Sequence, residues 1–148
     1  MTYETVVPEL FERLPNLRSA YETQFKYMGD EPPLQYLAFG SVLVPALETA
    51  LREEDLSSVA SICSFLEEVS QSGRKDGRLE ALLRVEVGEW LGWAQNEELL
   101  ATYMGQETKR ICGYVPGLAT QRLGLKLEQQ GSSLKSRLSS FFKGERSN

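Results

Sequence analysis

The sequence contains no histidine, and this absence excludes more functions than any residue that is present. Histidine is the commonest general acid or base near neutral pH and the commonest metal ligand in proteins. Ser-His-Asp and Cys-His catalytic sites, HExxH zinc sites and the Glu-xx-His ligands of di-iron bundles are therefore ruled out. The glycine-rich GxGxxG and GxxxxGK motifs that bind phosphate are also missing. We expect no catalytic residues, no metal and no cofactor.

Long apolar runs are missing too. No segment approaches the roughly 20 apolar residues that span a bilayer, and the N-terminal MTYETVVPEL has neither the basic start nor the apolar centre of a signal peptide. We therefore expect a cytoplasmic protein. Cysteine is scarce: Cys63 and Cys112 lie among apolar neighbours, which favours two reduced, buried thiols over a disulfide framework.

The charge that is present is unevenly distributed. The net charge is −5, yet residues 131–148 hold four Lys or Arg against one Glu, which leaves 12 basic against 20 acidic side chains in residues 1–130. A body this acidic repels nucleic acid and favours a basic protein partner. Hydrophobic residues make up 41% of the chain, a proportion typical of a folded globular domain.

Apolar residues recur every three or four positions along most of the chain, and this spacing predicts helices. The clearest stripe runs from Leu79 to Ala94, while Pro15 suits a first helical residue and Asp55 or Ser57 suits an N-cap. Pro45 predicts a kink near residues 41–44. No long alternation of apolar and polar residues predicts a strand.

These patterns predict an all-α fold: one domain of six to eight mostly antiparallel helices, with HEAT-like helical hairpins as an alternative arrangement. We place the helical domain at residues 1–128 and a basic amphipathic tail or last helix at residues 129–148. The tail carries Leu134, Leu138 and Phe141 among basic residues. We expect it to pack on the acidic body or to fray, and it is the single candidate for membrane contact.

Two hexamers are nearly identical, YMGDEP at 27–32 and YMGQET at 103–108. A repeated binding site or an internal repeat would explain them, but so would two similar helix ends. We favour the helix ends, in which Gly29 and Gly105 provide left-handed C-caps.

Glu86 and Glu89 form the most interesting carboxylate pair, because Glu86 lies inside the apolar stripe. A buried carboxyl group with a raised pKa can act as a general acid. The more ordinary expectation is that Glu86 bonds a backbone N–H, Arg84 or Arg110. Trp90 and Trp93 are expected to lie in the core and at its rim.

Five segments together resemble a known kind of protein: VVPELFERLPNL, MGDEPPLQYLAFGSVLVPALE, SSVASICSFLEEV, VGEWLGW and LLATYMGQETKR. They are similar to a family of small, all-helical bacterial immunity-like proteins that neighbour polymorphic toxins or contact-dependent inhibition systems. The resemblance covers about residues 6–112, and the tail after about Leu127 departs from it. In that pattern a Phe-Leu-Glu element maps to residues 65–67, a later Glu maps to Glu89, and a Gly-x-Glu-Thr element maps to residues 105–108.

The resemblance implies a cytosolic, non-catalytic protein that binds and neutralises one toxin domain. An acidic surface suits this role if the toxin has a basic active cleft. Three acidic turns, at residues 29–31, 52–55 and 96–98, are candidate contact sites, with Tyr36 and Trp93 as aromatic anchors. A helical scaffold or adaptor is one alternative, and a carboxylate-based enzyme is another. The candidate partner-binding residues are Asp30, Glu31, Tyr36, Glu53, Glu54, Asp55, Glu67, Glu89, Trp93, Glu97 and Glu98.

Overall fold

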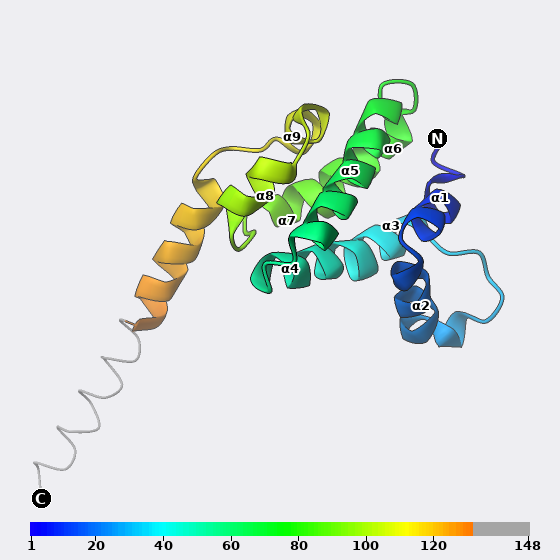
Figure 1. The fold of residues 1–148 in the computed structure, drawn as a ribbon, viewed down its shortest axis with the longest axis horizontal. Coiled ribbons are helices and arrows are strands. Elements are labelled where there is room, and N and C mark those ends of the chain that lie inside the picture. The colour runs from blue at the N-terminus through cyan, green and yellow to red at the C-terminus, as the bar shows by residue number, and fades with distance from the viewer. Residues whose placement is uncertain (132–148) are drawn as a thin grey trace, which may run out of the picture.

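The computed structural model describes residues 1–131, which form eight helical stretches and, within that range, no strand. Leu134, Leu138 and Phe141 of the expected amphipathic tail lie outside the described residues. The all-α, single-domain prediction is confirmed (Figure 1). The elements are α1 (Val6–Arg13), α2 (Pro15–Gln24), η1 (Lys26–Met28), α3 (Gln35–Ala38), η2 (Phe39–Leu43), α4 (Val44–Arg52), α5 (Leu56–Ser72), α6 (Gly77–Leu83), η3 (Arg84–Gly88), α7 (Glu89–Leu91), α8 (Glu97–Tyr103), α9 (Gln106–Cys112) and a last helix at 118–131.

Helix starts follow the local chemistry in most places. Pro15 is the first residue of α2, as predicted. Asp55 caps α5, because its carboxylate accepts hydrogen bonds from the Ser58 backbone N–H at 3.3 Å and from the Ser58 hydroxyl at 2.7 Å. Asn96 occupies the N-cap position of α8, but its side chain does not cap this helix. The Asn96 side chain instead donates to the Leu51 carbonyl at 3.2 Å.

Two short π-helical segments, η2 and η3, interrupt two helical stretches: the one predicted to kink before Pro45 and the one that begins at Leu79. The predicted irregularity before Pro45 takes this form: η2 ends at Leu43, and Pro45 follows in the first turn of α4. Proline has no N–H to donate to the preceding turn, so a wider turn there costs little. The segment η3 divides the stripe that begins at Leu79 into α6 and α7. The two π segments contact each other.

Helix α5 forms the centre of the core. It packs against α4 on one side and against α6, α8 and α9 on the other, as its position in Figure 1 shows. Val59, Phe65, Leu66 and Val69 of this helix are at most 1% exposed. Burial raises the pKa of both cysteine thiols, Cys63 and Cys112, to about 12. The prediction of two free, buried cysteines is confirmed.

The two hexamers differ in backbone conformation and in their position relative to the helices. Gly29 follows η1 with a positive φ of 64°, and Tyr27 beside it is 80% exposed. Gly105 is extended, with φ −72° and ψ 163°, and precedes α9 rather than closing a left-handed turn. The expected left-handed C-cap at Gly105 is therefore wrong, and the reason for glycine at this position is steric.

The last helix, 118–131, leaves the body (Figure 1). Its first turns contact the domain: Ala119 is buried, and Arg122 donates to the Gly92 carbonyl at 3.4 Å. Further along, Leu125 and Leu127 are 53% and 67% exposed. The described part of this helix is thus anchored at its first turns only.

Candidate functional site

The turn between α4 and α5 is brought close to the start of α8, so that two of the three predicted acidic turns meet. The hydrogen bond from Asn96 to the Leu51 carbonyl joins the 96–98 segment to the last turn of α4. Glu53, Glu54, Asp55 and Glu98 are all exposed there. These four residues are called the acidic edge below.

The arginines of the fold form their ion pairs elsewhere. Within residues 1–131, the ion pairs link Arg13 to Glu68, Arg74 and Arg110 to Glu107, Arg78 to Glu4 and Asp76, and Arg84 to Glu80. None of these pairs involves the acidic edge. The carboxylates of the edge are exposed and form no ion pair in the described part of the chain. Their negative charge is therefore not neutralised by a bound cationic side chain.

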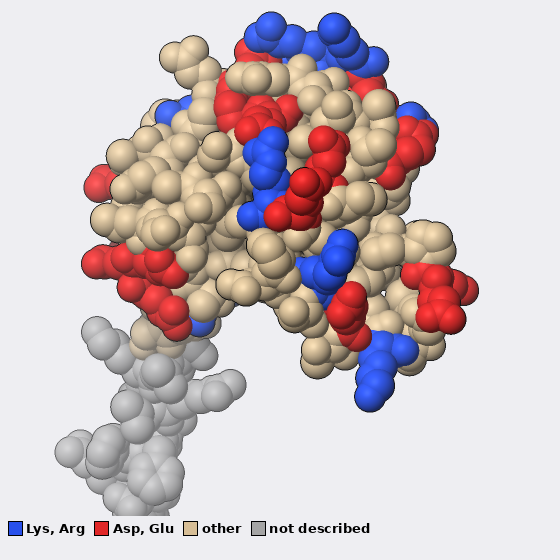
Figure 2. Space-filling view, turned by 45° about the vertical axis from the view of Figure 1, so that its right-hand side comes forward, with Lys and Arg blue, Asp and Glu red and all other residues tan. Residues whose placement is uncertain are grey.

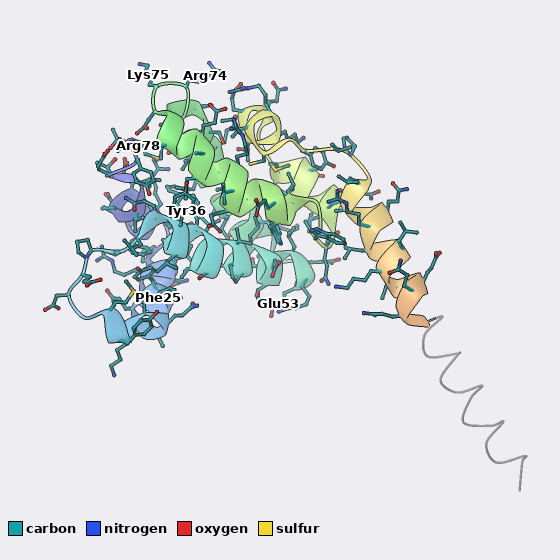
Figure 3. All side chains as sticks on the ribbon, turned by 180° about the vertical axis from the view of Figure 1, so that it is seen from behind. Phe25, Tyr36, Glu53, Arg74, Lys75 and Arg78 are labelled. Carbon is teal, nitrogen blue, oxygen red and sulfur yellow. The ribbon has the colours of Figure 1, made fainter. Side chains whose placement is uncertain are left out.

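Several basic side chains lie at the opposite end of the domain, although Arg52, in the last turn of α4, is beside the edge. Figure 3 shows Arg74 and Lys75 at the turn between α5 and α6, Arg78 at the start of α6, and Glu53 at the opposite border of the molecule. Figure 2 shows one group of Lys and Arg at the top and one group of Asp and Glu at the lower left, with charges of both signs between them and at the right. The two ends differ in pairing: Arg74 and Arg78 are paired with Glu107, Glu4 and Asp76, whereas the acidic edge takes part in no ion pair of residues 1–131.

Glu97 does not belong to this surface, although it is part of the 96–98 turn. Its side chain is 3% exposed, and its Oε1 accepts hydrogen bonds from the Thr120 hydroxyl at 2.7 Å and the Thr120 N–H at 3.3 Å. Its Oε2 is buried without a partner among the described residues. The expectation that Glu97 faces a partner needs correction, because this carboxylate instead caps the start of the last helix.

Glu67 has a similar internal role. Its Oε1 accepts the Glu107 N–H at 3.0 Å, and its Oε2 accepts both the N–H and the hydroxyl of Thr108, at 3.0 and 2.8 Å. The Thr108 hydroxyl also lies 2.9 Å from the buried Ser70 hydroxyl. A Cβ at residue 105 would lie 2.1 Å from Glu67 Oε2, so glycine is needed there. The Phe-Leu-Glu and Gly-x-Glu-Thr elements thus form one structural cluster at the N-terminus of α9.

Three of the other predicted contact residues, Asp30, Glu31 and Tyr36, lie apart from the acidic edge. Asp30 and Glu31 are exposed in the loop before α3, which Figure 1 shows on the opposite side of the domain from the α4–α5 turn. Tyr36 on α3 is 38% exposed. Glu89 lines a small cavity of about 160 Å³ with Tyr114 and Arg122. Asp30, Glu31 and Tyr36 therefore do not form one surface with the edge.

Trp93 is nearer to the edge. It lies three residues before Asn96 and is 50% exposed, with the Arg122 guanidinium 5.2 Å from its ring centroid. The prediction of a rim position is confirmed. Trp90 is half-buried, and its indole N–H donates to Glu48 of α4.

Glu86 makes neither of the contacts that were expected of it. Arg84 pairs with Glu80 and Arg110 pairs with Glu107, and no backbone N–H in residues 1–131 donates to Glu86. The carboxylate instead lies over Gly40, where a Cβ would come within 2.0 Å of its Oε2. Burial, and then the nearby Glu89, raise the pKa of Glu86. The side chain thus packs between the two π segments.

The described residues offer little to bind a metal ion. Residues 1–131 contain no cluster of three His, Cys, Asp or Glu side chains with a geometry suited to an ion. Over the same range, no helix combines the length and the apolar character required to cross a membrane.

The sequence interpretation missed a groove of about 640 Å³ between α2, α4 and the first half of α5. Its lining residues are mostly small, so the neighbouring helices do not fill the space between them. The signal was present as small residues at helical spacing on α4. The groove is lined by Leu17 and Ala20 of α2, Ala46 and Thr49 of α4, Ser61 and Ile62 of α5, and, at its end, Glu53 and Asp55.

Comparison with known proteins gives one family match. No curated protein and no solved structure matches the chain. One family model matches residues 7–114, a range that runs from α1 to just beyond α9 and leaves the last helix outside. The chain belongs to this family, which is described as a domain of unknown function (DUF7674).

Proposed function

We propose that this protein is a non-catalytic, immunity-like protein of the cytoplasm that binds a cognate bacterial toxin and blocks a basic surface or active cleft. The observation that carries the proposal is the acidic edge. Glu53, Glu54 and Glu98 are exposed and take no part in the ion pairs of the described chain. A basic surface is the natural complement of such an edge.

The pairing of the charges supports this orientation. A toxin domain with a basic cleft would be attracted to the unpaired acids of the edge, whereas Arg74 and Arg78 at the opposite end are already paired with Glu107, Glu4 and Asp76. Trp93 lies five residues before Glu98 of the edge and is half exposed. Partly exposed tryptophan is a common energetic anchor of interfaces.

The first experiment is co-expression with the protein encoded beside this gene. The proposal expects the two proteins to co-purify and expects growth to be rescued when both are produced. If the neighbouring protein is a toxin but neither binding nor rescue occurs, the proposed function is wrong. Binding without inhibition would favour the scaffold or adaptor alternative.

A charge-reversal pair then tests the surface itself. The double variant Glu54→Lys and Glu98→Lys reverses two exposed acids of the edge. The matched control, Glu12→Lys and Glu22→Lys, changes the net charge equally at two exposed acids on α1 and α2. At low salt the edge variant should slow association by about ten- to a hundred-fold, while the control should have a much smaller effect. Equal effects of the two variants would show that only net charge matters.

A further inference from the structure

The groove between α2, α4 and α5 and the last helix are complementary features, and the groove shares only its acidic end with the surface of the proposed function. The floor of the groove includes Val42 and Ala50, and Glu53 lies at the end formed by the last turn of α4. Of the charged residues in its lining, Arg13 is already paired with Glu68 at 2.5 Å. An apolar groove with an acidic end suits an amphipathic helix that carries basic residues.

The C-terminal segment of this chain has that character. Residues 118–148, called the arm below, contain six Lys or Arg against two Glu, whereas residues 1–117 contain ten against 19 acidic residues. In the described part of the arm, Leu127 is 67% exposed beside Lys126. The sequence then places Leu134, Leu138 and Phe141 at intervals of seven, four and three residues, which is helical spacing.

The direction of the arm decides which groove it meets. The arm starts beside the acidic edge, where Thr120 is bonded to Glu97, and helix 118–131 runs away from α2, as Figure 1 shows. Its 14 helical residues span about 20 Å at 1.5 Å per residue. To reach their own groove, the apolar residues that follow would have to return over that length. The groove of another molecule is free of this constraint.

We propose that the groove is the docking site for the arm of a second copy of this chain, and that two copies exchange arms about a two-fold axis. Each copy offers one groove and one arm, so a reciprocal exchange closes the assembly at a dimer. Burial of Leu127 and of the groove floor would favour association. The basic residues of the arm would lie near Glu53.

The molar mass of the purified full-length chain tests this directly. Light scattering coupled to gel filtration should give twice the 16.7 kDa chain mass at concentrations from about ten to a few hundred micromolar. A mass of one chain over this whole range would overturn the proposal. No toxin is present, so the result is independent of the proposed function.

Two single variants separate groove from arm. Ala46→Arg fills the groove with a bulky cation, and Leu127→Arg removes an exposed apolar contact of the arm. Each should raise the dimer dissociation constant at least tenfold. Val85→Arg, at an exposed residue outside the groove and the arm, is the matched control and should stay dimeric. If Ala46→Arg does not fold, Thr49→Arg in the same lining replaces it.

Mixing the two variants tests exchange. Ala46→Arg keeps an intact arm and Leu127→Arg keeps an intact groove, so a mixture should form a dimer with one of the two contacts at a concentration at which each variant alone is mostly monomeric. A dimer that persists with Ala46→Arg but is lost with Leu127→Arg would show that arm pairs with arm and would overturn the proposal. A mixture that remains monomeric would also overturn it.

Discussion

The last two helices are each capped by a glutamate from a distant part of the chain, but the two glutamates are used differently. Glu67 distributes three hydrogen bonds over both carboxylate oxygens at the start of α9. Glu97 uses only Oε1, on Thr120, and leaves Oε2 buried without a partner in the described residues. The same residue type therefore gives one fully satisfied anchor and one incomplete anchor.

This difference matches the packing of the two helices. Helix α9 buries Thr108, Ile111 and Cys112 against the core, so its cap belongs to the cooperative unit of the domain. The last helix buries little beyond Ala119. A satisfied cap thus accompanies a helix that is part of the core, whereas the incomplete cap holds a helix that projects from it.

The largest expected effect comes from removing the complete cap. Glu67→Ala should lower the free energy of unfolding by about 2–4 kcal/mol, because it leaves the donors at the start of α9 and the buried Thr108 hydroxyl with fewer partners. Chemical denaturation measures this change. Glu68→Ala, the neighbouring control, removes an exposed ion pair with Arg13 and should cost at most about 1 kcal/mol. Equal losses of unfolding free energy in the two variants would show that the Glu67 cap contributes no more than the exposed ion pair of Glu68.

A smaller effect is expected from crowding the same cap. Gly105→Ala places a Cβ where the Glu67 carboxylate lies and should cost about 1–3 kcal/mol. In a Glu67→Ala background the cost should fall to a few tenths of a kcal/mol, since the clash is gone. Gly77→Ala is the control, because a Cβ there meets no atom within 4 Å. If Gly105→Ala costs the same unfolding free energy in the Glu67→Ala background, the cost comes from the backbone conformation at residue 105 and not from a clash with Glu67.

The incomplete cap should give a more local effect. Glu97→Ala removes the two bonds to Thr120, so we expect amide protection to fall in residues 118–131 while α5 and α9 keep theirs. The global free energy of unfolding should change by about 1 kcal/mol, less than for Glu67→Ala. Hydrogen exchange followed by mass spectrometry distinguishes these outcomes. Loss of protection throughout the domain would mean that both caps serve the core.

The smallest effect concerns pH at the same end of α9. Arg74, and then Arg110, lower the pKa of Glu107 from 4.5 to about 2. A carboxyl group with a lowered pKa in the folded state stabilises the fold above its unfolded pKa, and this contribution is lost as pH falls from about 4.5 to about 2. The difference in unfolding midpoint between wild type and Glu107→Gln should therefore shrink over that interval. A difference that is constant with pH would contradict the assigned cause.

The sequence was a good guide where one local rule decided the outcome. Apolar spacing predicted the helices, Pro15 marked the start of α2, and Asp55 caps α5 as expected. The failures involve residues whose partners are distant in sequence. Glu67 and Gly105 are 38 positions apart, and neither the capping role of the first nor the steric need for the second follows from neighbours along the chain.

The candidate surface could be predicted only in part, because it too depends on contacts between residues that are distant in sequence. The segments 52–55 and 96–98 were identified as acidic turns, but the contact between them, which includes the hydrogen bond from Asn96 to Leu51, joins residues that are distant in sequence. Glu97 and Glu98 are adjacent and chemically identical, yet one is buried and the other exposed. Successive side chains of a helix point in different directions, and the start of the last helix contacts Glu97.

The π segment η2 also constrains the length of the chain. A π turn contains one residue more than the α-turn it replaces, and each residue of a helix rotates the following side chains by about 100°. Deleting one residue between Phe39 and Leu43 would therefore turn this segment into an ordinary α-turn and leave Leu47 and Leu51, which are now buried, facing the core. Inserting a further residue there would rotate both leucines away from the core, so η2 limits the number of residues that fit between α3 and α4.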